Sequence, residues 1–268
     1  MEEIFPGVFV VVNEKGGANL GFIIGKNGVV VIDTSLFMRK AEELKEYITS
    51  ITKKPIVAVV NTHYHPDHSF GNAAFTCSII AHEITREIME NMDKEYIKNI
   101  VDKLPEVAKD FQDFSIRLPT ITFKKSKKID LGDRSMSIIH VGGHTEDSSV
   151  ILVEPFNVLF AGDIVINDFH PEIVPDSNLK KWLKVLKRLL KWNVELVIPG
   201  HGSIGDDKSL IDMYNYLRKI QGFSEKIKSG KLDSLLEEIA EEPNFSNRKF
   251  PELFVHTLQV LSSSTMEK

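Results

Sequence analysis

The sequence predicts an α/β fold in which each half of the chain combines short strands with a helix. Short β-branched runs separated by Gly and Asn occur in both halves, as is typical of strands and turns. Two longer segments, 38–51 and 176–192, space their apolar residues as amphipathic helices do. Polar turns containing His, Asp and Gly follow several of the predicted strands, and open α/β sheets bind their ligands at such strand ends.

The first half is predicted to open with a meander and to continue into strands separated by helices. The apolar run after Pro55 has no polar alternation, which is expected of a strand buried on both faces. The segment 84–112 is polar and charged with scattered apolar residues, and we expect a helix there. The expected elements are strands at 7–13, 20–25, 28–33, 56–61 and 77–83, and helices at 38–51 and 84–112.

The second half returns to strands and ends in a helical tail. We expect short strands within 117–143, a hairpin over 148–163 turned at 154–157, and a strand at 194–202. In the tail, Pro243 and Pro251 are expected to break the helices. The predicted organisation is one domain over residues 1–205, with 84–112 as a helical lid insert, and a C-terminal helical segment, 206–268, packed on it. An apolar stripe in this tail needs cover from the domain or from a second subunit, so a homodimer is a possible state: Leu232, Leu235, Leu236 and Ile239.

The composition indicates an ordinary globular protein. Hydrophobic residues make up 42% and charged residues 26% of the 268 residues, and the formal net charge is −5. The acidic balance argues against a nucleic-acid partner. The single cysteine, Cys77, excludes an intramolecular disulfide framework and fits a reducing compartment. The acidic N-terminus lacks signal-peptide features, and no run approaches the roughly 20 apolar residues of a membrane span, so a cytoplasmic protein is expected.

The stretch VVNTHYHPDHSFGN, residues 59–72, places three of the nine histidines within six positions. Residues i and i+2 of an extended strand end point the same way, so His63 and His65 can face one metal ion. Pro66 then turns the chain, and Asp67 and His68 can point towards a second ion about 3.5–4 Å from the first. The combined H-x-H-x-D-H pattern predicts a metal site.

Three further candidate ligands lie downstream, each after a hydrophobic strand and each directly after a glycine. They are His144 in VGGHTEDS, Asp163 in FAGDIV and His201 in IPGHGS. A glycine at such a position allows a sharp backbone turn that brings the ligand close to the ion. Metal-type ligands at four separate strand ends strengthen the prediction of a metal centre.

The motifs THYHPDH, GGHTEDS, AGD and PGHG, in this order and spacing, resemble the metallo-β-lactamase superfamily from about residue 4 to residue 205. The resemblance implies a four-layer αββα sandwich with the metals at one edge, between two similar halves. An aspartate at 163 together with His68 is similar to the glyoxalase II-like and general metallo-hydrolase branches, and departs from the cysteine-containing β-lactamases. The ligands implied for the first metal are His63, His65 and His144, those for the second are Asp67, His68 and His201, and Asp163 bridges the two.

This ligand set predicts a dinuclear metal-dependent hydrolase of a small molecule. Mixed His/Asp ligation suits zinc, iron or manganese, and two divalent ions, zinc first among them, are the expected cofactors. Zinc can lower the pKa of bound water from about 9 to about 7. The resulting bridging hydroxide would attack an ester, thioester, lactone or phosphoester, and the two ions would hold the substrate oxygen and the leaving group. Asp67 is the predicted catalytic residue, because its second oxygen could orient the nucleophile and later pass on its proton.

Two other enzyme classes share these motifs. Persulfide dioxygenases share the scaffold and the motif. The resemblance to them implies a site with one iron, held by His63, His144 and Asp163. A tRNase Z-like nuclease is disfavoured by the acidic charge and by the lack of an evident RNA-binding arm. The complete ligand set argues against a third alternative, a non-catalytic interaction module.

Several residues near the motifs have both a functional and a structural interpretation. Asp33 and Thr62 could hold ligand histidines by hydrogen bonds, or Asp33 could be a turn residue. His82 is expected to be structural, and His140 to pack or to support a ligand. His170 is a candidate for substrate binding, with a turn histidine as the alternative.

Two helices raise similar choices. The basic helix 179–191 could lie on a membrane, but a solvated outer face over a buried apolar stripe is expected instead. The lid or core candidates of the insert are Met89, Met92, Tyr96 and Phe111.

Overall fold

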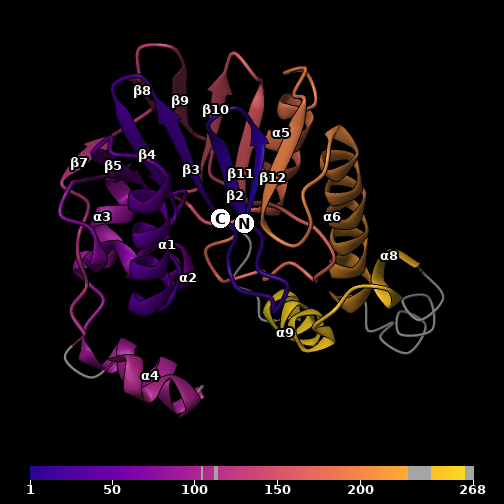
Figure 1. Ribbon diagram of the computed structural model, residues 1–268. Helices are drawn as coiled ribbons and strands as arrows, with labels where there is room; N and C mark the ends of the chain where they lie inside the picture. Colours follow the sequence, from indigo (N-terminus) through magenta and orange to yellow (C-terminus); the bar gives the residue numbers. More distant parts are fainter. Residues whose placement is uncertain (104, 112–113, 229–242, 263–268) are drawn as a thin grey trace. The chain divides into compact units, whose positions relative to one another are not determined.

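The computed structural model describes residues 1–103, 105–111, 114–228 and 243–262. The chain forms two compact units, the first from Met1–Val12 and Gly17–His140, the second from Asn13–Gly16 and Val141–Lys268. The predicted boundary at residue 205 lies inside the second unit and stays a prediction. Figure 1 labels the helices and strands of both units.

The first unit is built on a seven-stranded sheet in simple sequential order. The first four strands pair antiparallel, which confirms the predicted meander, and the last four pair parallel. The parallel strands end at a common edge, where Asp33 and the 59–72 motif follow two neighbouring strands. The strands are β1 (Glu2–Phe5), β2 (Val8–Val11), β3 (Leu20–Gly25), β4 (Gly28–Ile32), β5 (Ile56–Val60), β6 (Ser78–His82) and β7 (Ile121–Phe123).

Helix α1 (Met38–Ile51) packs on this sheet through three of the four residues that its periodicity indicated, while the fourth, Ile51, is 43% exposed. Ala41, Leu44 and Ile48 are buried in one apolar cluster with sheet residues such as Phe22. Full burial of a leucine or isoleucine side chain contributes about 1.5–3 kcal/mol, so this face fixes the helix on the sheet. A hairpin of β8 (Ser126–Asp130) and β9 (Ser135–His140) completes the unit's strands among the residues described.

The predicted continuous helix over 84–112 is wrong in one respect, because the segment is divided. The structure has α3 (Glu83–Glu90), α4 (Lys94–Lys103) and a 3-10 helix, η2 (Pro105–Phe111). Asp93 accepts a hydrogen bond from the Tyr96 backbone N–H at 2.9 Å, so it begins a new helix instead of continuing the old one.

The lid candidates of this segment have different surroundings. Met89 is 1% exposed, and the ring of Phe111 lies 6.1 Å from that of Phe70, centroid to centroid. Met89 therefore packs as a core residue does, whereas Phe111 is half-buried and contacts a core ring. A lid role for Met92 and Tyr96, which are half-buried, stays a prediction.

The second unit contains the predicted hairpin, now β10 (Ser149–Glu154) and β11 (Val158–Ile166), paired antiparallel. β11 is buried along all nine residues and pairs parallel with β12 (Leu196–His201). The crossover between β11 and β12 includes α5 (Leu179–Leu189), whose Trp182 donates its indole N–H to the carbonyl of Ile164 at 2.9 Å. This bond fastens α5 next to the Asp163 position of β11.

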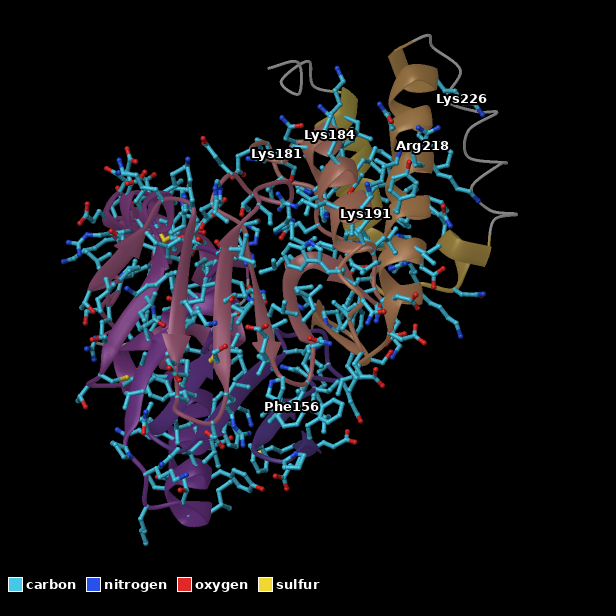
Figure 2. All side chains as sticks on the ribbon, turned by 90° about the horizontal axis from the view of Figure 1, so that it is seen from above. Phe156, Lys181, Lys184, Lys191, Arg218 and Lys226 are labelled. Carbon is cyan, nitrogen blue, oxygen red and sulfur yellow. The ribbon has the colours of Figure 1, made fainter. Side chains whose placement is uncertain are left out.

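The cations of α5 lie opposite its buried face. Figure 2 labels Lys181 and Lys184 on α5, and Arg218 and Lys226 on α6 (Asp207–Lys228). The α5 lysines are exposed, which confirms the solvated outer face expected from the sequence. Among the residues that the structure describes, no helix is both long and apolar enough to cross a bilayer. The buried residues of α5 are Leu179, Trp182, Leu183, Val185, Leu186 and Leu189.

The C-terminal part is helical, as predicted, with α8 (Pro243–Ser246) and α9 (Pro251–Ser262). Both prolines stand at the first residue of a helix, where their missing N–H is not needed, so they begin helices instead of breaking them. The predicted tail stripe at 232–239 lies outside the described residues.

Candidate metal centre

The first unit brings four predicted ligands together in the loop after β5. The short helix α2 (Pro66–Ser69) starts directly after His65, with Pro66 at its first position. The ring centroid of His63 lies 4.6 Å from that of His65 and 4.2 Å from that of His68. Asp67 Oδ2 lies 3.8 Å from His68 Nε2. The tight turn at Pro66 therefore gathers these side chains, and their division between two ions stays a prediction.

Asp33, at the end of β4, holds this loop in place. Its Oδ2 lies 2.8 Å from His68 Nδ1, and its carboxylate accepts hydrogen bonds from both the backbone N–H and the hydroxyl of Thr62 at 2.8 Å. Thr62 Oγ1 in turn lies 3.1 Å from His63 Nδ1. Metal-binding histidines usually have one ring nitrogen held in this way, which directs the other towards the ion. The geometry therefore supports the interpretation that Asp33 and Thr62 orient ligand histidines.

Replacing Asp33 by Asn should weaken metal binding about 10- to 100-fold, because it removes the charge that fixes His68 while keeping the side-chain shape. Zinc titration against a chromophoric chelator measures the change. The exposed Asp102→Asn variant on α4 loses the same charge and should bind zinc as the wild type does. Equal zinc affinity in wild type and Asp33→Asn would contradict this role.

A pair of buried amides supports the loop from beneath. Asn61 and Asn72 are both 0% exposed and exchange two side-chain hydrogen bonds, of 3.0 and 2.8 Å. The Asn61 amide also donates to the His68 carbonyl at 3.0 Å, and so does the Thr34 hydroxyl at 3.2 Å. These three residues were not singled out from the sequence. The sequence signal that could have indicated Asn61 is an asparagine directly after an apolar strand, as in VVN.

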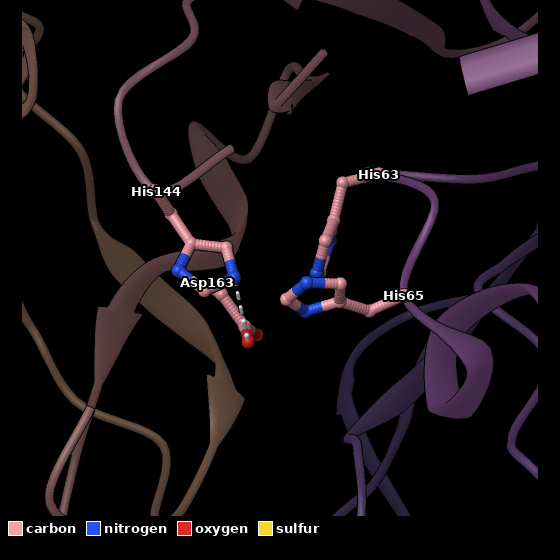
Figure 3. Close-up of side chains that lie close together, drawn as sticks. All are labelled: His63, His65, His144 and Asp163. Carbon is pink, nitrogen blue, oxygen red and sulfur yellow. Dashed lines mark ion pairs between the residues drawn. The ribbon is translucent and has the colours of Figure 1, made fainter. Parts of the chain in front are cut away.

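The second unit brings the remaining three predicted ligands together. Asp163 Oδ2 lies 3.5 Å from His144 Nε2 and 3.4 Å from His201 Nε2. Figure 3 draws His144 and Asp163 of this unit, with their ion pair dashed, and it also draws His63 and His65 of the first unit. The β11–β12 register shifts on both sides of Gly162, an irregularity of the kind that often re-aims side chains at functional sites. One carboxylate oxygen thus lies within reach of two imidazoles.

Both histidines of the second unit have defined neighbours within that unit. His201 Nδ1 lies 2.9 Å from the Gly16 carbonyl, which leaves Nε2 facing Asp163. The ring of His144 is 5.2 Å from the indole of Trp182, in an edge-on arrangement. The Ser177 hydroxyl donates to the backbone carbonyl of His144 at 2.5 Å.

Two of the glycines that precede ligands are required for different reasons. Gly143 has φ +120°, and a Cβ there would come 2.9 Å from the Cα of Trp182. Gly200 needs space instead, because a Cβ would overlap Asp163 Oδ1. A side chain at position 200 would therefore displace Asp163, and one at position 143 would displace Trp182.

The donor set fits divalent metal ions. Three histidines have Nδ1 near a hydrogen-bonding partner, namely His63, His68 and His201, so that Nε2 can serve as the ligand atom. Neutral imidazoles with carboxylates are ligands for zinc, iron and manganese. The side chains of the two units that could hold metal ions are His63, His65, Asp67, His68, His144, Asp163 and His201.

His82 is structural, as expected. Its Nδ1 accepts the backbone N–H of Ile84 at 3.3 Å, so it caps α3, and its Nε2 lies 2.9 Å from the Lys124 carbonyl. His140 stacks on its ring with centroids 3.8 Å apart. His140 therefore packs against His82.

His170, the candidate for substrate binding, is buried at 3% exposure, with Nδ1 2.8 Å from the Tyr216 hydroxyl. Burial, together with the nearby positive charge of Arg248, lowers the pKa of the imidazole to about 4. Its ring also lies against Phe245 and Phe254. A neutral histidine in an aromatic cluster contributes to packing, and its role towards substrate stays a prediction.

Comparison with known proteins points to one family. Residues 14–201 match the family model described as the metallo-beta-lactamase superfamily. The acyl-coenzyme A thioesterase MBLAC2 of Homo sapiens is 26% identical over 238 residues, covering 81% of this chain and 85% of that protein. The metallo-beta-lactamase type 2 of Bacillus cereus is 26% identical over 196 residues, covering 71% and 69%.

Solved structures agree with the sequence comparison. The metallo-beta-lactamase from Pontibacter korlensis has a TM-score of 0.63 at 22% identity, covering 81% of this chain and 97% of its own. The DIM-1 metallo-beta-lactamase has a TM-score of 0.64 at 20% identity, covering 81% and 96%. At these identities the likeness shows the fold, which is the four-layer αββα sandwich expected from the sequence.

Proposed function

Because the chain belongs to the metallo-β-lactamase superfamily and is a metal-dependent hydrolase of it, we propose that it uses two metal ions to hydrolyse carboxylic esters or thioesters. One observation carries the dinuclear part. Asp163 Oδ2 lies 3.5 Å from His144 Nε2 and 3.4 Å from His201 Nε2, and these two histidines are the implied ligands of different ions. A carboxylate so placed is suited to bridge two ions.

The residues assigned to the second ion argue against the mononuclear alternative. A dioxygenase-like iron site would use His63, His144 and Asp163 alone. Here His68 and His201 are also held through Nδ1, by Asp33 and by the Gly16 carbonyl, in the manner of metal ligands. In a site with one iron, neither His68 nor His201 would bind metal.

The chain's own groups have distinct tasks in this proposal. When bound, the two ions would supply Lewis acidity and lower the pKa of water at the site. Asp163 would hold the ions together, and Asp33 would keep His68 oriented. Asp67, whose side chain is 29% exposed, can be reached by solvent and substrate. It would orient the attacking water through one carboxylate oxygen and take up its proton.

Among acyl substrates, the thioesterase relatives support a thioester. The matches to the thioesterases of Homo sapiens and Gallus gallus cover 81% of this chain and 85% and 84% of those proteins. The likeness therefore extends beyond the ligand motifs. The thiolate leaving group needs little protonation, because a thiol has a pKa near 8.5. With the half-buried Asp67 carboxylate at the site, the chain could therefore complete the reaction without a dedicated general acid.

Elemental analysis and a substrate panel test the proposal together. We expect about two zinc ions per chain after expression in zinc-replete medium, and faster turnover of an acyl-coenzyme A than of a lactone or a phosphodiester. Iron and manganese reconstitution run in parallel. One iron per chain with oxygen uptake on a persulfide would overturn the proposal. We also propose a cytoplasmic location, because a chain with the single cysteine Cys77 fits a reducing compartment.

A further inference from the structure

The segment 248–250, between α8 and α9, lies outside the residues that match the family. We propose that this 248–250 segment positions the metal ligand His201, through the backbone of Gly16. The inference rests on the proposed assignment of His201 as a ligand of the second ion. All the contacts that carry it lie within the second unit.

The 248–250 segment is bonded to the loop that follows β11. The backbone N–H of Lys249 donates to the Asp168 carbonyl at 2.8 Å, and the Lys249 carbonyl accepts the N–H of His170 at 3.1 Å. The Arg248 guanidinium donates to the carbonyls of Ile166 and Phe169, at 3.1 and 2.6 Å. Its charge also lies 4.8 Å from the centre of the Tyr216 ring. These bonds fix the segment on the chain just beyond Asp163.

Phe250 connects this segment with Gly16. Its ring stacks on Phe169 with centroids 5.2 Å apart and planes 24° from parallel. The Phe250 ring also lies against Gly16, where an added Cβ would come 2.6 Å from Phe250 Cζ. Phe250 adopts φ +60°, which a bulky residue rarely does unless its surroundings fix it. Gly16, at φ +87°, has the freedom to let the ring approach.

Gly16 in turn holds the ligand. Its carbonyl lies 2.9 Å from His201 Nδ1, and this directs His201 Nε2 to within 3.4 Å of Asp163 Oδ2. A shift of the Gly16 carbonyl would therefore rotate the imidazole away from the ion. Loss of a partner that holds a ligand histidine in this way typically lowers metal affinity 10- to 100-fold.

A second route leads from the same loop to the backbone of His201. The N–H of Asn167 donates to the His201 carbonyl at 3.0 Å, and Asn167 Nδ2 donates to the Ser203 carbonyl at 2.8 Å. Asp168 Oδ2 accepts the N–H of Ser203 at 2.8 Å. Arg248 bonds to both ends of this stretch, so the 248–250 segment supports the ring and the backbone of His201.

The alternative is that the segment only anchors the C-terminal helices. An anchor would change stability and leave zinc affinity alone. Phe254 on α9 provides the matched control, since it is 7% exposed and packs on His170, Phe223 and Phe245. It belongs to the same aromatic region, and none of the contacts of Gly16 and His201 given above involves it.

The experiment measures zinc affinity of the full-length protein by competition with a chromophoric chelator, together with thermal unfolding. We expect Phe250→Ala to weaken the second zinc at least 10-fold and to leave the first within about twofold. Phe250→Tyr should restore the affinity, because the ring against Gly16 is kept. Phe254→Ala should lower the unfolding temperature and keep both zinc affinities. If Phe250→Ala fails to fold, Phe250→Leu takes its place.

His201→Ala separates failure of the inference from failure of the proposed function. If the wild type binds only one zinc, or if His201→Ala keeps both affinities, the dinuclear assignment is wrong and the inference fails with it. If those two proteins behave as proposed while Phe250→Ala binds zinc as the wild type does, the positioning role is wrong. Equal loss of the second zinc in Phe254→Ala would also overturn it.

Discussion

Replacing Asp163 by Asn is expected to lower kcat about a thousandfold and to release one metal ion per chain. The neutral amide keeps the shape of the side chain but removes the negative charge that lies between His144 and His201. A two-metal clamp supplies several kcal/mol of charge stabilisation, and about 1.4 kcal/mol corresponds to a factor of ten in rate. Steady-state turnover and elemental analysis after gel filtration measure the two effects.

The control for this variant is Asp212→Asn, which makes the same chemical change at an exposed position of α6. It should retain full activity and the metal content of the wild type. Retention of both ions by Asp163→Asn, with more than a tenth of the activity, would show that Asp163 is not the bridging residue.

Replacing Gly200 by Ala should have the second-largest effect, although alanine adds only a methyl group. The new Cβ would overlap Asp163 Oδ1 and would come 2.8 Å from the Gly162 carbonyl carbon, so the carboxylate must move. Overpacking of this kind costs about 1–3 kcal/mol of stability. We expect loss of one zinc and about a hundredfold lower kcat, since a misplaced reacting group can cost that much.

Gly222→Ala on α6 separates the steric effect from the chemical change. A Cβ at Gly222 would meet nothing within 4 Å, and alanine is the better helix former by about 1 kcal/mol. This variant should be as active as the wild type and equally or more stable in urea. If Gly200→Ala unfolds at the same urea concentration as the wild type and keeps both ions, the crowding at Asp163 has been overestimated.

The candidate ligands could be singled out from the sequence because their signals are local. In H-x-H-x-D-H the spacing itself determines which side chains share a direction, and each later ligand follows a strand and a glycine. The hairpin at β10–β11 and the apolar face of α5 were equally local and are confirmed. Fold recognition followed from the order of the same motifs.

The residues that support the ligands could not be predicted in this way. His201 and Gly16 are 185 positions apart, and the contact of Gly16 with Phe250 spans nearly the whole chain. No periodicity relates such positions, because only the folded backbone brings them together. The break between α3 and α4 was missed for another reason: Asp93 can start a helix or sit within one, and the hydrogen bond to Tyr96 decides.

The amide pair beneath the ligand loop also restricts how this sequence can evolve. Asn61 and Asn72 are each other's donor and acceptor in a fully buried setting. An apolar residue at position 72 would remove the bond that Asn61 Oδ1 accepts, at a cost of about 1–3 kcal/mol. When Asn61 changes instead, Asn72 keeps its bonds with the Thr34 hydroxyl and the Arg117 carbonyl. Substituting both by apolar residues would remove that penalty but would also release the His68 carbonyl from Asn61. A single change at either position therefore lowers stability or loosens the ligand loop, which restricts the order in which the pair can diverge.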